Sequence, residues 1–244
     1  MDRLRNAASV LAAGTIFATF LWFSAKPREL IIGIPIIAGV AVATSAILCF
    51  IALKRRAPVA PGAFPCLLVG SLTLANLFVE DANLRIGLAL VTAVLFYILT
   101  RYIYEFIVSH GFTQALSALS EWSAAMIIFG STSGLLAAVT FLGLNIWLAT
   151  LIFAVVCTFV SLALANLTEG ASFAIAGVVA LVIIEGFAVL AMLPISYWVC
   201  GGVLIVVSYL LFSLTRAAEP SRMRRSVLFA CALCLILLIT ARWK

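Results

Sequence analysis

The feature that most constrains this chain is a succession of apolar runs of about 20 residues, each bounded by charged or turn-forming residues. A helix of that length crosses the roughly 30 Å of hydrocarbon in a membrane and satisfies its backbone hydrogen bonds internally, as lipid requires. The sequence therefore predicts an all-α, polytopic transmembrane helix bundle in which residues 1–244 form a single integral-membrane domain. About nine spans are expected, or eight if the short last run lies in the membrane interface: 7–25, 31–53, 64–80, 86–108, 123–144, 146–167, 171–192, 195–215 and 226–241.

The composition agrees with a membrane protein and argues against a nucleic-acid partner. Hydrophobic residues make up 66% of the 244 residues and charged residues only 10%, whereas about 25% of a soluble domain is charged. The net charge of +6 has a simpler cause than nucleic-acid binding, because Lys and Arg collect in the cytoplasmic loops of membrane proteins. All six cysteines lie within apolar runs, and Cys231 and Cys234 lack the further Cys or His of a metal site. We therefore expect neither a metal nor another cofactor.

The distribution of the basic residues predicts the orientation of the chain. Short basic loops stay on the cytoplasmic side of a membrane. An inside N-terminus places ten of the 15 Lys and Arg residues on that side: Arg3, Arg5, Lys54, Arg55, Arg56, Arg101, Arg216, Arg222, Arg224 and Arg225. The chain is therefore expected in the cytoplasmic membrane with its N-terminus inside and its C-terminus outside.

A short amphipathic segment precedes the fifth run. Phe112, Leu116 and Leu119 repeat at helical spacing, and polar residues occupy the other faces. This pattern is typical of a helix that lies in the membrane interface, so we expect a short interfacial helix near residues 110–121. An unstructured loop is the alternative.

The stretch between the third and fourth runs concentrates polar residues. Asn76, Glu80 and Asn83 follow Thr73 at steps of three and four, so a helix through them would carry one polar stripe, with Arg85 just beyond. The alternative is a turn outside the membrane with charged helix ends. We keep Asn76, Glu80 and Asn83 as a candidate polar stripe.

Two further sites combine charge with apolar surroundings. Arg101 and Glu105 are four residues apart in the fourth run, so they lie on one helix face and are a candidate ion pair. Glu185 lies within the seventh run, and an ionisable group inside a membrane indicates a functional site with a partner. The candidate partners of Glu185 are Arg85, Tyr197 and Ser196, and a structural hydrogen-bond node between helices is the alternative.

The fifth run contains small residues at helical spacing. Gly130, Gly134 and Ala138 are four residues apart and lie on one face, which lets two helices approach closely. Packing within the bundle and a homo-oligomer contact through the Gly130 and Gly134 face both remain open. The other expected partners are the lipid bilayer and other membrane proteins.

Glu80-Asp81-x-x-x-Arg85 followed by Phe106-x-x-x-His110 resembles the first two motifs of the CAAX-type intramembrane proteases. In that family a paired acid activates water, and histidines on neighbouring helices complete the site. Here the second acid is Asp rather than Glu, and His110 is the only histidine, so the later histidine motif of the family is absent. In the expected topology Glu80 and His110 lie on opposite sides of the membrane, whereas a general base must lie within about 3 Å of its proton. An intramembrane hydrolase is therefore the last of three interpretations.

Three longer stretches, taken in order, are similar to a family of uncharacterised multi-pass inner-membrane proteins of bacteria: residues 64–87, 183–212 and 222–243. The resemblance implies a bacterial cytoplasmic membrane and a membrane-spanning last run, and it supplies no activity. The function expected first is a non-enzymatic, membrane-embedded binding, assembly or structural component. The second is a carrier of small solutes or lipids with Glu185 as its polar centre.

Overall fold

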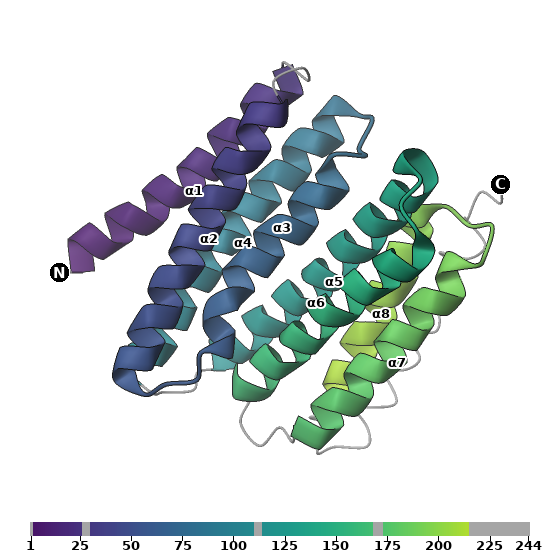
Figure 1. Ribbon diagram of the computed structural model, residues 1–244. Coiled ribbons are helices and arrows are strands. Elements are labelled where there is room, and N and C mark those ends of the chain that lie inside the picture. The colour runs from purple at the N-terminus through teal and green to yellow at the C-terminus, as the bar shows by residue number, and fades with distance from the viewer. Residues whose placement is uncertain (1, 26–29, 110–113, 168–172, 215–244) are drawn as a thin grey trace. The chain divides into compact units, whose positions relative to one another are not determined.

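The computed structural model describes residues 2–25, 30–109, 114–167 and 173–214, and all regular secondary structure in these ranges is helical (Figure 1). The all-α prediction is thereby confirmed. The helices are α1 (Asp2–Ala25), α2 (Leu30–Arg55), the short 3-10 helix η2 (Ala60–Ala63), α3 (Phe64–Asn76), α4 (Ala82–Ser109), α5 (Gln114–Leu142), α6 (Ile146–Leu167), α7 (Phe173–Ala191) and α8 (Tyr197–Leu214).

Five of the described helices are long and apolar enough to cross a membrane, so the chain is a membrane protein. Three shorter apolar helices accompany them: Ser9–Trp22, Ala60–Asn76 and Tyr197–Phe212. The described residues thus show five span-length helices rather than nine, and the expected ninth span, 226–241, lies outside them. The spanning portions are Gly33–Arg55, Ala82–Ser109, Ala118–Leu142, Ile146–Leu167 and Phe173–Ala191.

The predicted third span, 64–80, is wrong in length, because α3 ends at Asn76 after 13 residues. The N–H groups of Phe78 and Val79 donate to carbonyl oxygens only three residues earlier, at 3.1 and 3.3 Å. Such bonds tighten the last turn and satisfy carbonyl groups at the end of a helix. The chain therefore turns before it reaches Glu80.

The separate interfacial helix expected near 110–121 is also wrong, because residues 114–142 form one continuous helix, α5. Neither Gly nor Pro separates Glu121 from the apolar residues that follow it, so nothing interrupts the helix there. Its membrane-compatible portion begins at Ala118. Residues 110–113 lie outside the described ranges.

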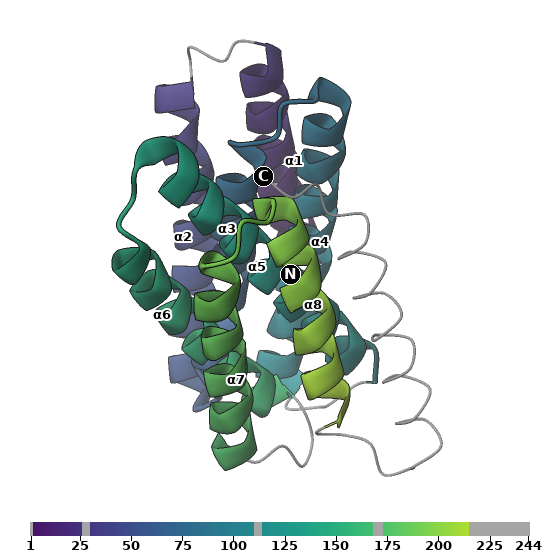
Figure 2. The same ribbon diagram turned by 90° about the vertical axis from the view of Figure 1, so that its right-hand side faces the viewer.

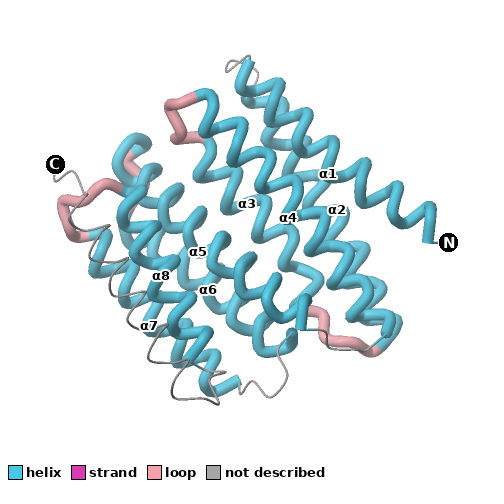
Figure 3. The backbone as a smooth tube through the Cα atoms, turned by 180° about the vertical axis from the view of Figure 1, so that it is seen from behind, coloured by secondary structure: helices cyan, strands magenta, loops and turns pink. Residues whose placement is uncertain are grey.

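The chain divides into two compact units, residues 1–123 and residues 124–244, with the boundary inside α5. The expectation of a single membrane domain stays a prediction. In the first unit α1 packs on α2 and α4, α2 packs on α3, and α3 packs on α4. Its α2–α3 and α3–α4 connections lie at opposite ends (Figure 3). Large apolar side chains fill the core between these helices, among them Ile16, Phe20, Ile37, Val69 and Phe96.

The end of α2 has a defined geometry that brings η2 close to it. The N–H groups of Arg56 and Ala57 donate to the carbonyl oxygens of Leu53 and Ala52, at 3.2 and 2.9 Å, which is the Schellman arrangement. The motif requires a left-handed residue, and Arg56 adopts φ 57° there. A Cβ atom on Gly62 of η2 would lie 3.0 Å from the backbone nitrogen of Cys49 in α2, so only glycine fits this approach.

In the second unit α7 packs on both α6 and α8 (Figure 2). The ring of Phe153 on α6 stacks on that of Phe187 on α7 with 4.3 Å between centroids. Gly186 of α7 lets Leu204 of α8 approach, since a Cβ atom there would lie 3.1 Å from its Cδ2 atom. α7 therefore buries one face against both neighbours.

α5 is the most completely buried of the five span-length helices. From Ser123 to Ala138 nearly every residue is buried, whereas α6 and α7 bury only one face. Gly130, Gly134 and Ala138 are among these buried residues. Burial of the small-residue face favours packing within the chain over an exposed oligomer seam.

Candidate functional site

The polar stretch at residues 76–87 forms the turn between α3 and α4. Asp81 caps α4: its carboxylate Oδ1 accepts a hydrogen bond from the Leu84 N–H at 2.9 Å, and its carbonyl accepts one from Arg85 N–H at 3.0 Å. An acidic cap satisfies the free N–H groups of a helix start and suits its positive dipole. The structure therefore matches the turn with charged helix ends.

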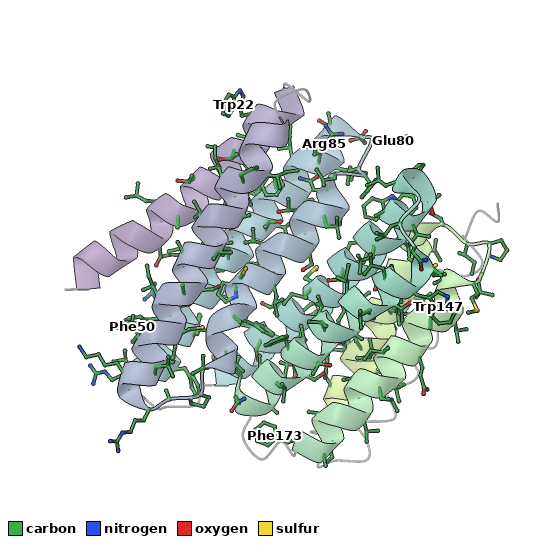
Figure 4. All side chains as sticks on the ribbon, viewed as in Figure 1. Trp22, Phe50, Glu80, Arg85, Trp147 and Phe173 are labelled. Atoms are coloured by element: carbon green, nitrogen blue, oxygen red, sulfur yellow. The ribbon has the colours of Figure 1, made fainter. Side chains whose placement is uncertain are left out.

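The candidate stripe is not continuous, because the helix breaks between its members. Asn76 is buried at the end of α3, whereas Glu80 lies in the exposed turn and Asn83 is exposed in the first turn of α4. Glu80 and Arg85 lie at one end of the first unit, as does Trp22 (Figure 4). Tryptophan is enriched at the level of lipid headgroups, which suits this end of the unit.

Arg85 holds the turn through its side chain. Its Nη2 atom donates to the carbonyl oxygen of Val79 at 2.6 Å. Its Nε atom, the Oδ1 atom of Asn76 and the Oγ1 atom of Thr73 are buried without a hydrogen-bond partner in the described part of the chain. The guanidinium therefore stabilises the α3–α4 connection and belongs to the first unit, whereas Glu185 belongs to the second.

The acidic pair of the protease-like motif is divided between two environments. Glu80 is exposed, and Asp81 is engaged as the helix cap. His110 lies outside the described residues. The described geometry thus gives Asp81 a local structural role, and the hydrolase interpretation stays a prediction.

Arg101 and Glu105 form an ion pair on the exposed face of α4, with 3.2 Å between Nε and Oε1. α4 has 28 residues, so it is about 42 Å long, or about 12 Å longer than the hydrocarbon core. A pair in the last third of such a helix can reach the interface, where it neutralises itself and its Arg side chain extends toward water.

Glu185 lies on the exposed face of α7. The opposite face, with Val179, Ile183 and Phe187, is buried. The neighbours of Glu185 one turn before and after it are apolar and exposed: Leu181, Val182 and Val189. In the described part of the chain, Glu185 makes no hydrogen bond or ion pair.

Tyr197, another expected partner of Glu185, begins α8. Its ring lies edge-on to Phe141 of α5 with 5.7 Å between centroids, and 5.1 Å from the ring of Trp198. Trp198 in turn stacks on Phe129 of α5 at 6.0 Å. These aromatic contacts join α8 to α5, which is a packing role that the sequence analysis did not assign to Tyr197.

A group of buried hydroxyls in α5 was missed by the sequence analysis. Ser123, Thr132 and Ser133 are fully buried, and their hydroxyl oxygens have no hydrogen-bond partner in the described part of the chain. The signal was present as the polar sequence Ser131-Thr132-Ser133 within an apolar run. A Cβ atom on Gly201 of α8 would collide with the Ser133 Oγ atom, so this hydroxyl packs directly on the backbone of α8.

Among the residues that the structure describes, no three His, Cys, Asp or Glu side chains gather as a metal site would require. No family model, curated protein or solved structure matches the chain. The two family resemblances noted from the sequence therefore stay predictions.

Proposed function

We propose that this chain is a membrane-embedded binding or assembly component, and that the exposed carboxyl group of Glu185 marks the surface with which it binds. The single observation that carries the proposal is the position of Glu185 on an exposed apolar face of a span-length helix. The proposal assigns no chemical step to the chain.

The cost of this arrangement supports a binding role. A charged side chain near the centre of a spanning helix costs about 2.5–3.5 kcal/mol on insertion scales. The oxygen atoms of a carboxyl group accept hydrogen bonds, and the N–H groups in the middle of a helix already donate to its own carbonyl groups. Glu185 therefore requires a donor from outside α7, and a binding partner supplies one.

Substitution of Glu185 tests the proposal. Glu185→Leu should remove the polar contact and shift the chain to a smaller complex in gently solubilised native membranes. Glu185→Gln should retain the larger complex, because its amide both donates and accepts. Glu105→Gln is a matched control on the exposed face of α4. If Glu185→Leu leaves the complex unchanged in size and abundance, the proposed binding surface is wrong.

We further propose that the chain lies in a bacterial cytoplasmic membrane with its N-terminus inside and its C-terminus outside. The exposed residues Lys54, Arg55 and Arg56 at the end of α2 support this orientation, because they lie at the opposite end of the first unit from the acidic α3–α4 turn (Figure 3).

Thiol labelling of a variant without native cysteines tests the orientation. A cysteine at the exposed position Pro58 should react only after the membrane is permeabilised, whereas one at the exposed position Ala82 should react in intact cells. A reporter fused to the C-terminus should read outside. The opposite labelling pattern at positions 58 and 82 would reverse the orientation.

A carrier of small solutes or lipids is the second candidate function. The buried, unpartnered hydroxyls of Thr132 and Ser133 in the spanning portion of α5 favour it. The immediate helical neighbours of Glu185 are apolar, so they give it no polar surroundings of its own. The carrier proposal therefore rests on the hydroxyl groups of α5. The double substitution Thr132→Val and Ser133→Ala should abolish solute uptake while the protein still folds. Unchanged uptake would exclude a transport path along these hydroxyl groups.

A further inference from the structure

The exposed face of α7 has the spacing of a helix-packing seam. Val178 and Leu181 of α7 are 61% and 57% exposed, and Met192, which directly follows the helix, is 69% exposed. Steps that alternate between three and four residues place side chains along one line of a helix and produce left-handed packing against a second helix. The full line follows these steps without interruption: Ala174, Val178, Leu181, Glu185, Ala188 and Met192. We call these six residues the α7 seam.

Small residues lie on or beside the α7 seam. Ala174 and Ala188 belong to it, and Gly177 is exposed beside it, with nothing within 4 Å of where its Cβ atom would be. Small residues let the backbones of two membrane helices approach closely. The surface around Glu185 can therefore accept another helix at short range.

Glu185 is the one ionisable residue of the α7 seam. A single polar residue at a core position of a helix pair fixes both the register and the number of helices. Its equivalent on a second helix would have to lie at the same depth in the membrane and to donate or accept a hydrogen bond. These two requirements restrict the identity of the partner.

We propose that two copies of this chain associate through the α7 seam, with the Glu185 carboxyl groups facing each other across a two-fold axis. This inference rests on the binding role proposed above and names the partner. Copies of one chain insert in the same orientation, so their α7 helices are parallel and every seam residue meets its equivalent at the same depth. A second copy therefore brings a polar group to the correct level, with no need for another protein to carry one there.

The chemistry of the carboxyl group fits a symmetric pair. A protonated carboxylic acid has one O–H donor and a carbonyl acceptor, so two of them can bond to each other reciprocally. Lysine and arginine only donate and could not form such a pair. The polar residue Thr158 on the exposed face of α6 differs from Glu185, because its hydroxyl already donates to the carbonyl oxygen of Ala154 on the same helix, at 2.8 Å.

Cysteine cross-linking in native membranes tests the inference. Leu181→Cys and Val178→Cys, each in a variant without native cysteines, should form covalent dimers under mild oxidation. Val155→Cys is the matched control, because Val155 is 50% exposed on α6, close to the exposure of Leu181 on α7. Equal cross-linking of Val155→Cys and Leu181→Cys would overturn the proposed seam.

The Glu185 variants then test the carboxyl pair. Adding Glu185→Leu to Leu181→Cys should weaken dimerisation by roughly five- to thirty-fold, as loss of a polar pair between membrane helices does. Adding Glu185→Gln should preserve dimerisation. If Glu185→Leu does not fold, Glu185→Lys replaces it and is co-expressed with the parent chain. Mixed dimers of the two chains should then form more readily than homodimers of Glu185→Lys. Dimerisation that is indifferent to all three changes would overturn the pair.

The results also separate this inference from the proposed function. A complex that shrinks in Glu185→Leu, without any cross-link between α7 helices, would overturn the homodimer and keep a binding role with a different membrane protein. A chain that shows no cross-link and no change of complex size in Glu185→Leu would overturn both.

Discussion

Replacing Gly201 with alanine should destabilise the second unit, although alanine is the better helix former. Gly201 lies in α8 against α5. A Cβ atom there would lie 3.1 Å from the Phe129 Cδ2 atom, 3.2 Å from the Phe129 carbonyl oxygen and closer still to the Ser133 Oγ atom. The Ser133 hydroxyl can rotate away, but the Phe129 carbonyl is fixed within its helix. α8 must therefore move outward from α5.

The magnitude follows from two opposing contributions. Overpacking a close contact by one methyl group costs about 1–3 kcal/mol. Replacing glycine with alanine inside a helix contributes about 0.5–1 kcal/mol in the opposite direction. The net loss of unfolding free energy should therefore be about 0.5–2 kcal/mol. The assay is the thermal midpoint of the monodisperse protein in detergent, followed through intrinsic tryptophan fluorescence because Trp198 lies close to the contact.

Gly87→Ala is the matched control for this experiment. Gly87 is exposed in α4, with nothing within 4 Å of the position that a Cβ atom would take, so alanine should raise the midpoint there. Ser133→Ala removes the nearest colliding atom and should recover part of the stability lost in Gly201→Ala. The account of the α5–α8 contact is refuted if Gly201→Ala is as stable as Gly87→Ala.

Three further substitutions test local features of the fold. Arg56→Gly should stabilise the chain by about 1 kcal/mol in chemical or thermal unfolding, because glycine adopts the left-handed conformation without strain; a destabilised Arg56→Gly would contradict this. Asp81→Ala should cost about 1 kcal/mol by removing the cap of α4, and Asp81→Asn should cost much less. Gly134→Leu should disrupt folding in detergent far more than Gly87→Leu, since only Gly134 is buried. Equal tolerance of both changes would show that the small-residue face of α5 is not a close helix contact.

The positions of most helices could be predicted because apolar runs and turn residues agree. The link between α5 and α6 has no formal charge nearby, yet Gly143 adopts a positive φ of 67° and Asn145 caps α6 through its side chain, accepting a bond from Trp147 N–H at 2.8 Å. Glycine and asparagine are the residues that these two positions favour. Asn145 and the lengths of the apolar runs therefore placed this turn between the predicted spans 123–144 and 146–167, and Gly143 suits the same position.

Helix ends were predicted less well where hydropathy and hydrogen bonding point in different directions. Phe78 and Val79 extend the apolar run beyond α3, but their N–H groups donate to carbonyl oxygens three residues earlier, in the turn that leads to Asp81. Glu121 interrupts the apolar run of α5, but a single charge does not break a helix. Hydropathy measures the free energy of transferring side chains into lipid. It therefore does not show where a helix is capped or whether it continues past a charged residue.

The direction in which a side chain points could not be predicted from one apolar run. α7 is apolar on all faces except at Glu185, so its sequence alone does not show which face packs on α6 and α8. The structure fixes this through large side chains such as Phe187, which stacks on Phe153. That contact leaves Glu185 on the other side of the helix.

The exposed faces of α6 and α7 share an apolar character and differ in one chemical respect. A threonine such as Thr158 satisfies its hydroxyl on its own helix, so α6 can face lipid without loss. The carboxyl oxygen atoms of Glu185 find no free donor on α7, because the helix uses its own N–H groups. Lipid therefore suits α6 as a permanent neighbour, whereas α7 requires a partner that donates a hydrogen bond at the depth of Glu185. In the proposed dimer a second copy of the chain meets this requirement through the same residue, because each of two protonated carboxyl groups donates to the other. The matched pair Val155→Cys and Leu181→Cys measures the difference between α6 and α7 directly.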